Sequence, residues 1–371
     1  MVDLQTQYAF IKPQVDAGIQ EVLSSAQFIN GPAVKTFQTN LEEYLGVKHV
    51  IPCANGTDAL QIAMMGLGLK PSDEVITADF TFAATVEVIA LLGLTPVLVD
   101  VLPDTFNIDP KAVENAITPN TKAIVPVHLF GQAADMDALM EIAQKHNLYV
   151  IEDNAQGIGA NFTAKDGTKT KIGGIGHVGS TSFFPSKNLG CYGDGGAIFT
   201  NDDDLAHTIR GVVNHGMYKR YHHDVVGVNS RLDTLQAVVL NEKLKLLDFY
   251  NERRKWAAIR YTQLLENHPN IQTPVTLGDC DSHVYHQYTL RLIDTDRDAV
   301  VAHFQELGIP CGVYYPIPLH LQKAYADSRY NEADFTVTNQ LVKEVISLPM
   351  HSELDEEQIQ HICKTLLAFL G

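Results

Sequence analysis

The chain alternates between two patterns of apolar and polar residues from about residue 50 to residue 200. Short, continuously apolar runs predict buried strands, and longer stretches with an apolar residue every three or four positions predict helices. Strands are expected at 50–51, 75–76, 96–99, 123–127 and 149–151, and helices at 59–67, 85–92, 110–117 and 136–146. Because strands that alternate with helices form crossover units, the predicted fold class is α/β with a mostly parallel central sheet.

The remaining segments predict helices before this region and a second unit after it. Helices are expected at 11–28 and 34–45, with Asn30-Gly31-Pro32 between them, and further helices from about 202 to 267, interrupted by a polar, aromatic stretch at 217–224. The last part predicts strands at 284–292 and 313–315 and helices at 298–307 and 355–369. We therefore expect a large domain at residues 1–245 and a smaller α/β domain at residues 246–371.

Composition and charge restrict the class of protein. The chain has 371 residues, of which 45% are hydrophobic, and a formal net charge of −17. Nucleic acids and acidic membranes attract clustered Lys and Arg, so neither is an expected partner. No stretch reaches the roughly 18 apolar residues of a membrane span, and the first residues lack the pattern of a signal peptide. We expect a soluble, cytoplasmic enzyme.

Lys187 is the first candidate for chemistry. It lies between a strand that ends at Ser182-Phe183-Phe184 and a glycine-rich turn that ends at Gly196. A lysine held in such a place can lose its proton, and a neutral amine attacks a carbonyl to form a Schiff base. The alternative is an ordinary surface lysine in a turn.

Three other segments contain residues that could bind different parts of one ligand. Gly56 and Thr57 lie where a predicted strand leads into a helix, which suits a phosphate, with Thr57 or Asp58 as the helix cap. Ser182 could add a hydroxyl if the sheet brings it near. Asp153, at a strand end, would pair with a cation such as a protonated pyridine nitrogen, and Phe82 could cover an aromatic ring. Each also has an ordinary interpretation: a capped helix, a strand-end aspartate and a core phenylalanine.

Two further segments could bind a substrate. Asn229 and Arg231 offer an amide and a planar guanidinium to an anion, although an Arg–Asp surface pair is the alternative. The stretch from Tyr314 and Tyr315 to His320 contains two prolines and could receive a sugar or a base, or form a loop between domains.

Two familiar patterns are rejected. Gly174–Gly179 matches G-x-G-x-x-G, but it precedes a strand, whereas the dinucleotide fingerprint precedes a helix. His222-His223-Asp224 and His283-x-x-His286 lack a third ligand at a suitable distance, so no metal site is predicted.

Several of these motifs occur in the order seen in one family. They are Asn55-Gly-Thr-Asp58, Thr81-Phe82, Glu152-Asp153-x-Ala-Gln156, Ser182-Phe-Phe-Pro-Ser-Lys187 and Gly227-x-Asn-Ser-Arg-Leu-Asp233. The chain resembles the DegT-type nucleotide-sugar aminotransferases, which are pyridoxal-phosphate (PLP) enzymes with the fold of aspartate aminotransferase (fold type I). The similarity extends from about residue 3 to the end.

The resemblance implies a role for each motif. Lys187 would form the imine with PLP and move a proton during transfer, Asp153 would pair with the pyridine nitrogen, and Phe82 would stack on the ring. Gly56, Thr57 and Ser182 would hold the phosphate, and Gln156 would lie near the ring hydroxyl. In a homodimer with shared active sites, Asn229 would reach the phosphate of the partner's cofactor. Many relatives have a histidine where this chain has Ile158, so any role of that histidine does not carry over.

The resemblance also indicates a substrate. The segments 220–223, 228–231 and 315–319 look most like enzymes that aminate UDP-2-acetamido-2-deoxy-3-oxo-glucuronate, with L-glutamate as donor, for bacterial surface polysaccharide such as lipopolysaccharide O-antigen. Arg231 would then pair with the sugar carboxylate, and Tyr314, Tyr315 and His320 would contact the substrate. Alternatives are another keto-sugar (dTDP-3-keto or UDP-4-keto) and a non-catalytic PLP-binding regulator. A PLP-dependent sugar dehydratase would carry histidine in place of Lys187, and a nicotinamide oxidoreductase rests only on the rejected glycine pattern.

Overall fold

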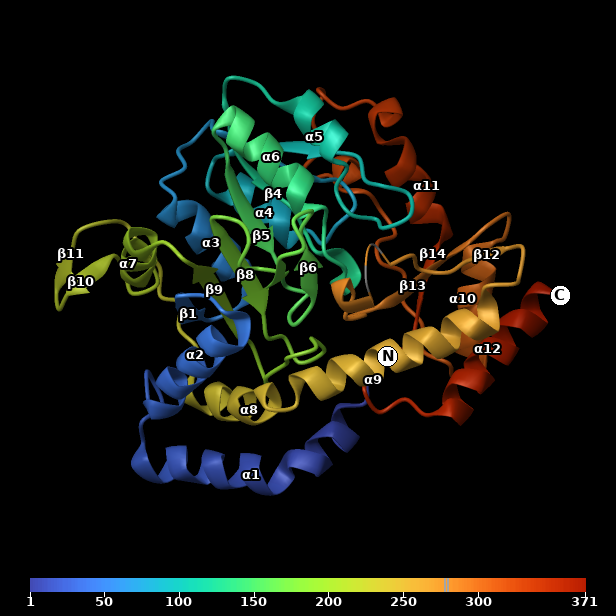
Figure 1. Ribbon diagram of the computed structural model, residues 1–371, viewed down its shortest axis with the longest axis horizontal. Helices are drawn as coiled ribbons and strands as arrows, with labels where there is room; N and C mark the ends of the chain where they lie inside the picture. Colours follow the sequence, from blue (N-terminus) through green and yellow to red (C-terminus); the bar gives the residue numbers. More distant parts are fainter. Residues whose placement is uncertain (277, 279) are drawn as a thin grey trace.

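A single large sheet forms the centre of the molecule (Figure 1). The computed structural model describes residues 1–276, 278 and 280–371. Within this part the central sheet has seven strands in the order β1-β9-β8-β5-β4-β2-β3. Their bounds are β1 (His49–Cys53), β2 (Glu74–Ala78), β3 (Thr95–Val99), β4 (Thr121–Val125), β5 (Tyr149–Asp153), β8 (Val178–Ser182) and β9 (Gly196–Thr200).

Most neighbouring strands of this sheet are parallel, as predicted. β5 pairs in parallel with β4 and β8, and β2 pairs in parallel with β3 and β4. β9 runs antiparallel to both of its neighbours, β1 and β8. Since antiparallel neighbours need no crossover helix, a turn connects β8 to β9 directly. That turn carries Lys187, and it starts at the same edge of the sheet at which β5 ends.

Helices cover both faces of the sheet, which explains why its strands are continuously apolar. Along β5, Val150 packs in one core and Ile151 in the other. Met136 and Leu139 of α6 pack against the first face, and α3, α4 and α7 pack against the second. The helices of this region are α2 (Pro32–Leu45), α3 (Gly56–Gly66), α4 (Ala84–Leu91), α5 (Pro110–Ala116), α6 (Met136–His146), α7 (Asp203–Val212) and α8 (Thr234–Leu244).

The C-terminal part has its own small antiparallel sheet and its own core. Its elements are α9 (Leu247–Leu265), β12 (Ile271–Gln272), β13 (Tyr288–Leu292), α10 (Arg297–Glu306), α11 (Thr336–Glu344), β14 (Val345–Leu348) and α12 (Glu356–Leu370). The predicted boundary between residues 245 and 246 lies between α8 and α9. Leu247 packs in a core that α2 and α8 share, and Ala257 packs in the C-terminal core, so α9 spans both. The division into two domains stays a prediction.

The remaining elements lie at the periphery. α1 (Leu4–Ser25) packs against α8, β6 (Asn161–Thr163) pairs with β7 (Lys169–Lys171), and β10 (Met217–Lys219) pairs with β11 (His222–His223). The β10–β11 hairpin projects away from the body of the molecule (Figure 1). Short 3-10 helices span Leu129–Gly131, Cys280–Ser282, Leu319–Leu321 and Glu332–Phe335. No helix in the described ranges is long and apolar enough to cross a membrane.

Two predicted element starts and one predicted strand differ clearly from the structure. The first helix begins at Leu4, because the Asp3 side chain accepts from the Thr6 N–H and caps it. The strand predicted at 284–292 begins only at Tyr288, since the N–H of Val284 donates to the carbonyl of Gly131 instead. The strand predicted at 313–315 is absent from the described structure, where only the adjacent Gly312 forms an isolated bridge, to Ser347.

Candidate active site

The turn between β8 and β9 fixes Lys187 in place. The N–H of Phe183 donates to the carbonyl of Gly195 at 2.7 Å, and the N–H of Lys187 donates to the carbonyl of Phe184 at 2.8 Å. A Cβ at Gly190 would overlap with backbone carbonyl atoms of the same turn, so glycine is required there. The lysine is therefore presented by a tight turn at the carboxyl edge of the sheet.

The surroundings of Lys187 favour a neutral amine. Burial of the side chain lowers its pKa to about 8, and the negative charge of Asp153 partly opposes this shift. A larger fraction of the amine is thus unprotonated near neutral pH than for an ordinary lysine. Such an amine can act as a nucleophile and can exchange protons.

Asp153 forms the end of β5 and is only 5% exposed. Its Oδ2 accepts from Thr85 Oγ1 at 2.8 Å, and its Oδ1 accepts from the N–H of Ala155 at 3.1 Å. β5 is followed by a turn and not by a helix, so Asp153 does not cap one. It supplies an oriented, buried negative charge.

The first turn of α3 lies against the end of β8. The side chain of Asn55 caps this helix by accepting from the N–H of Asp58 at 2.8 Å, so the prediction that Thr57 or Asp58 would be the cap was wrong. A Cβ at Gly56 would come within 2.7 Å of the Ser182 Cβ. The sheet therefore does bring Ser182 to the helix start, where free N–H groups and a hydroxyl suit an anion.

Aromatic and amide side chains form another part of the site. Phe82 is 58% exposed, and its ring centroid lies 6.2 Å from that of Tyr315. Gln156 Nε2 donates to the Tyr315 hydroxyl at 3.2 Å, and Gln156 Oε1 accepts from the N–H of Phe130 at 2.6 Å. The exposed face of Phe82 is therefore available to a flat ring.

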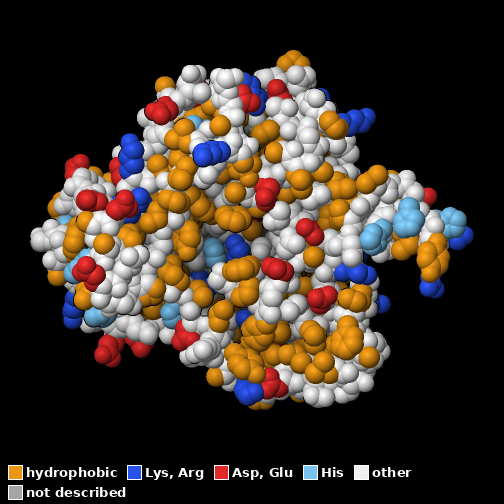
Figure 2. All heavy atoms as spheres, turned by 180° about the vertical axis from the view of Figure 1, so that it is seen from behind, with side chains coloured by type: hydrophobic (Ala, Val, Ile, Leu, Met, Phe, Trp, Pro, Cys, Tyr) orange, Lys and Arg blue, Asp and Glu red, His pale blue; other side chains and the backbone are white. Residues whose placement is uncertain are grey.

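These groups line one cavity of about 810 Å³. Of the residues predicted from the sequence, the cavity brings together Gly56, Thr57, Phe82, Asp153, Gln156, Ser182, Lys187, Tyr314 and Tyr315. Figure 2 shows a hollow in one face of the molecule, with histidine and lysine or arginine side chains inside it and hydrophobic side chains around it.

Three predicted residues do not line this cavity. Asn229 is exposed and bridges to Asn214, and Arg231 is half-buried. Between them, Ser230 is buried, accepts from the N–H of Ala54 at 3.0 Å and donates to Asp58 at 2.6 Å, which anchors the segment at the start of α3.

The third residue is His320, which is buried beside β2. The backbone N–H of His320 donates to Asp79 Oδ1 at 2.7 Å, and the ring Nδ1 lies 2.6 Å from Asp79 Oδ2. Its ring stacks on that of Phe335. Within this chain His320 therefore contacts a carboxylate and an aromatic ring behind the cavity wall.

The family follows from comparisons with known proteins. The model of the DegT/DnrJ/EryC1/StrS aminotransferase family matches residues 10–367. The chain belongs to this family. It is 49% identical over 365 residues to the UDP-2-acetamido-2-deoxy-3-oxo-D-glucuronate aminotransferase of Pseudomonas aeruginosa, and the alignment covers 98% of both chains. It is also 47% identical, over all of this chain and 98% of the relative, to the pleiotropic regulatory protein of Geobacillus stearothermophilus.

A solved structure has the same fold. The crystal structure of NtdA from Bacillus subtilis, with the cofactor PMP bound, superimposes with a TM-score of 0.87 at 32% sequence identity. The alignment covers 96% of this chain and 81% of that one. The α/β fold predicted from the sequence is thus confirmed.

The sequence pattern suggested His286 only as a possible metal ligand. His286 lines the cavity, and its buried Nδ1 has no hydrogen-bond partner among the described residues. Burial and the positive charges of Lys187 and Arg254 hold the pKa of His286 well below its ordinary value, so the ring is neutral. Sequence spacing could not reveal this contact, because His286 comes from the C-terminal part of the chain. Among the described residues no group of three His, Cys, Asp or Glu is placed to hold a metal ion.

The rejected glycine pattern surrounds a carboxylate of the protein itself. Glu152 accepts from the N–H groups of Gly173, Ile175 and Gly176 at 2.6–2.7 Å and lies 2.9 Å from His128 Nε2. Burial alone would raise the pKa of Glu152, but these hydrogen bonds hold it below its ordinary value. The pattern leads into a strand and not a helix, as predicted, although β8 already begins inside it at Val178.

Proposed function

We propose that the protein is a PLP-dependent aminotransferase that transfers an amino group to a keto group of a nucleotide-linked sugar. The observation that carries this proposal is a single cavity that contains a lysine with a lowered pKa, a buried aspartate and a phosphate-suited helix start. The family supports the same reaction.

The residues of the cavity fit each part of PLP. The aldehyde requires an amine, and Lys187 provides one whose pKa is lowered to about 8. The pyridine nitrogen requires a carboxylate, which Asp153 provides in an orientation set by two donors. The phosphate suits the start of α3 beside Ser182, and the flat ring suits the exposed face of Phe82.

The bound cofactor would supply an electron sink and a carrier for the amino group. The residues of this chain supply the rest. Lys187 Nζ would hold the aldehyde and, when free, would take a proton from the substrate and return it. Asp153 would keep the pyridine nitrogen protonated, and Phe82 and Tyr315 would contact the ring from one side of the cavity.

For the substrate, we propose UDP-2-acetamido-2-deoxy-3-oxo-glucuronate, with L-glutamate as amino donor. The Pseudomonas aeruginosa relative bears the name of this reaction. Arg231 would pair with the sugar carboxylate, and Tyr314 and Tyr315 would line the sugar site. We propose no direct contact between His320 and the substrate, because its side chain is buried and does not line the cavity.

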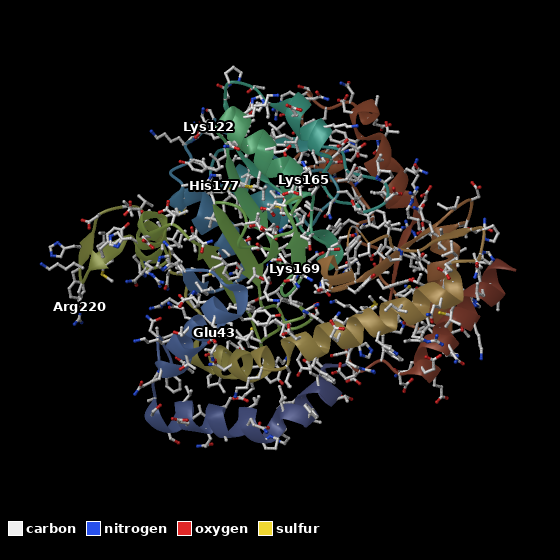
Figure 3. The ribbon with its side chains drawn as sticks, in the orientation of Figure 1. Glu43, Lys122, Lys165, Lys169, His177 and Arg220 are labelled. Atoms are coloured by element: carbon white, nitrogen blue, oxygen red, sulfur yellow. The ribbon has the colours of Figure 1, made fainter. Side chains whose placement is uncertain are left out.

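We further propose a cytoplasmic homodimer with shared active sites. Asn229 and Arg231 lie outside the cavity of their own chain, and the nearby β10–β11 hairpin stands clear of the body. Arg220, at the tip of this hairpin, points away from the molecule (Figure 3). Such a hairpin suits insertion into a second copy, where Asn229 would reach the phosphate. The product would enter surface polysaccharide, including O-antigen.

A second candidate function is that of a PLP-binding regulator, because the Geobacillus stearothermophilus relative is named a pleiotropic regulatory protein. One experiment separates the candidates. The purified protein with PLP is mixed with L-glutamate and then with UDP- or dTDP-linked 3-keto or 4-keto sugars. The aminotransferase forms 2-oxoglutarate and an amino sugar, whereas a regulator leaves both substrates unchanged, and amination of only a dTDP- or 4-keto sugar would overturn the uronate assignment.

A further inference from the structure

The carboxylate of Asp153 is held by donors from two different elements. Thr85 Oγ1 donates to Oδ2 at 2.8 Å, and the N–H of Ala155 donates to Oδ1 at 3.1 Å. Because an ionised carboxylate only accepts hydrogen bonds, the Thr85 hydroxyl must be the donor. Thr85 is 1% exposed and does not line the cavity, so any effect it has on a ligand passes through Asp153.

The same hydrogen bond joins two walls of the site. Thr85 lies in the first turn of α4, three residues after Phe82, and its N–H donates to the carbonyl of Phe82 at 3.4 Å. Asp153 lies at the end of β5. The bond therefore fixes both the direction of the carboxylate and the position of the segment that presents the Phe82 ring.

We propose that Thr85 is a positioning residue for PLP: its hydroxyl holds the Asp153 carboxylate in one orientation for the pyridine nitrogen and ties the Phe82 segment to β5. This inference rests on the proposed role of Asp153. A valine of the same shape would leave Oδ2 buried without this donor, and hydrogen bonds to charged groups are among the stronger ones in proteins. A serine would restore the donor.

The test measures the dissociation constant of PLP by titrating apo-protein and following visible absorbance. Thr85→Val should weaken binding about tenfold and Thr85→Ser by less than about twofold. Thr77→Val is the matched control, because Thr77 is equally buried in β2 and its Oγ1 donates to the carbonyl of Val125 at 2.8 Å, away from the cavity. It should lose thermal stability but bind PLP as the wild type does. Asp153→Ala is measured alongside.

The outcomes distinguish failure of the positioning role of Thr85 from failure of the proposed role of Asp153. If Asp153→Ala weakens binding and Thr85→Val does not, the role of Thr85 is wrong while the proposed function stands. If Asp153→Ala binds PLP like the wild type, the proposed role of Asp153 fails and this inference fails with it. Equal weakening by Thr77→Val and Thr85→Val would show general destabilisation and also overturn the inference. If Thr85→Val does not fold, Thr85→Ala is put through the same comparison.

Discussion

Gly56, the first residue of α3, lies directly against Ser182 at the end of β8: a Cβ on Gly56 would come within 2.7 Å of the Ser182 Cβ. This contact allows the helix N–H groups and the serine hydroxyl to face the same point of the cavity. Two elements more than a hundred residues apart in the sequence thus meet at one point of the cavity lining that suits an anion.

Gly56→Ala should weaken PLP binding about tenfold or more, because the added methyl group pushes α3 away from Ser182 and separates the phosphate donors. Absorbance titration of the apo-protein measures this. Gly174→Ala is a suitable control, since its Cβ would come closer than an ordinary contact only to the side chain of Val47, and Gly174 lies outside the cavity. Unchanged binding by Gly56→Ala would contradict the assignment of the phosphate.

The rate of PLP capture should depend on the protonation of Lys187. With a pKa of about 8, the neutral fraction falls about tenfold for each pH unit below 8 and levels off above it. Stopped-flow absorbance of apo-protein with PLP should follow this profile, and Lys187→Ala should show no capture. Lys243 is a matched control, because burial also lowers its pKa to about 8 outside the cavity. A profile that changes in Lys243→Met would refute the assignment to Lys187.

Arg231→Ala should lose at least about tenfold in kcat/KM on the 3-oxo-uronate, since a charge-assisted bidentate pair is removed. PLP binding should stay the same. Arg231→Lys should recover only part of the loss, because an ammonium does not form the planar fork. The corresponding sugar without the carboxylate provides the control substrate, on which wild type and variant should react alike. An equal loss of kcat/KM on both sugars would contradict the pairing of Arg231 with the sugar carboxylate.

Glu152→Ala should lower the free energy of unfolding by roughly 3–5 kcal/mol, because it leaves three N–H groups and the buried His128 without their acceptor. Urea unfolding measures the loss. Glu141→Ala breaks only the exposed pair with Lys165, labelled in Figure 3, and should cause no measurable change. Comparable effects of the two substitutions would show that Glu152 has no structural role.

Much of the fold could be predicted because local patterns determine it. The helix at 136–146 has the predicted bounds, and β1, β2, β3, β4, β5 and β8 lie at the predicted positions with ends that differ by a few residues, whereas β9 was not predicted. Strands buried on both faces must be apolar throughout, so their pattern is unambiguous. Prediction failed at 313–315, where an apolar and aromatic run resembles a strand but only the adjacent Gly312 forms a bridge, to Ser347.

The sequence by itself determined the fold class, the order of the motifs and the chemical character of Lys187, Asp153 and the start of α3, because these depend on residue type and on neighbours along the chain. Only the tertiary structure decided which of these groups share a cavity. It brought Ser182 to Gly56, set the Thr85 hydroxyl on Asp153 and added His286 from the C-terminal part. It also placed Arg231 and His320 outside the cavity lining. The physical reason is that distances across a sheet and between its loops follow from strand order and packing, and neither can be read from spacing along the chain.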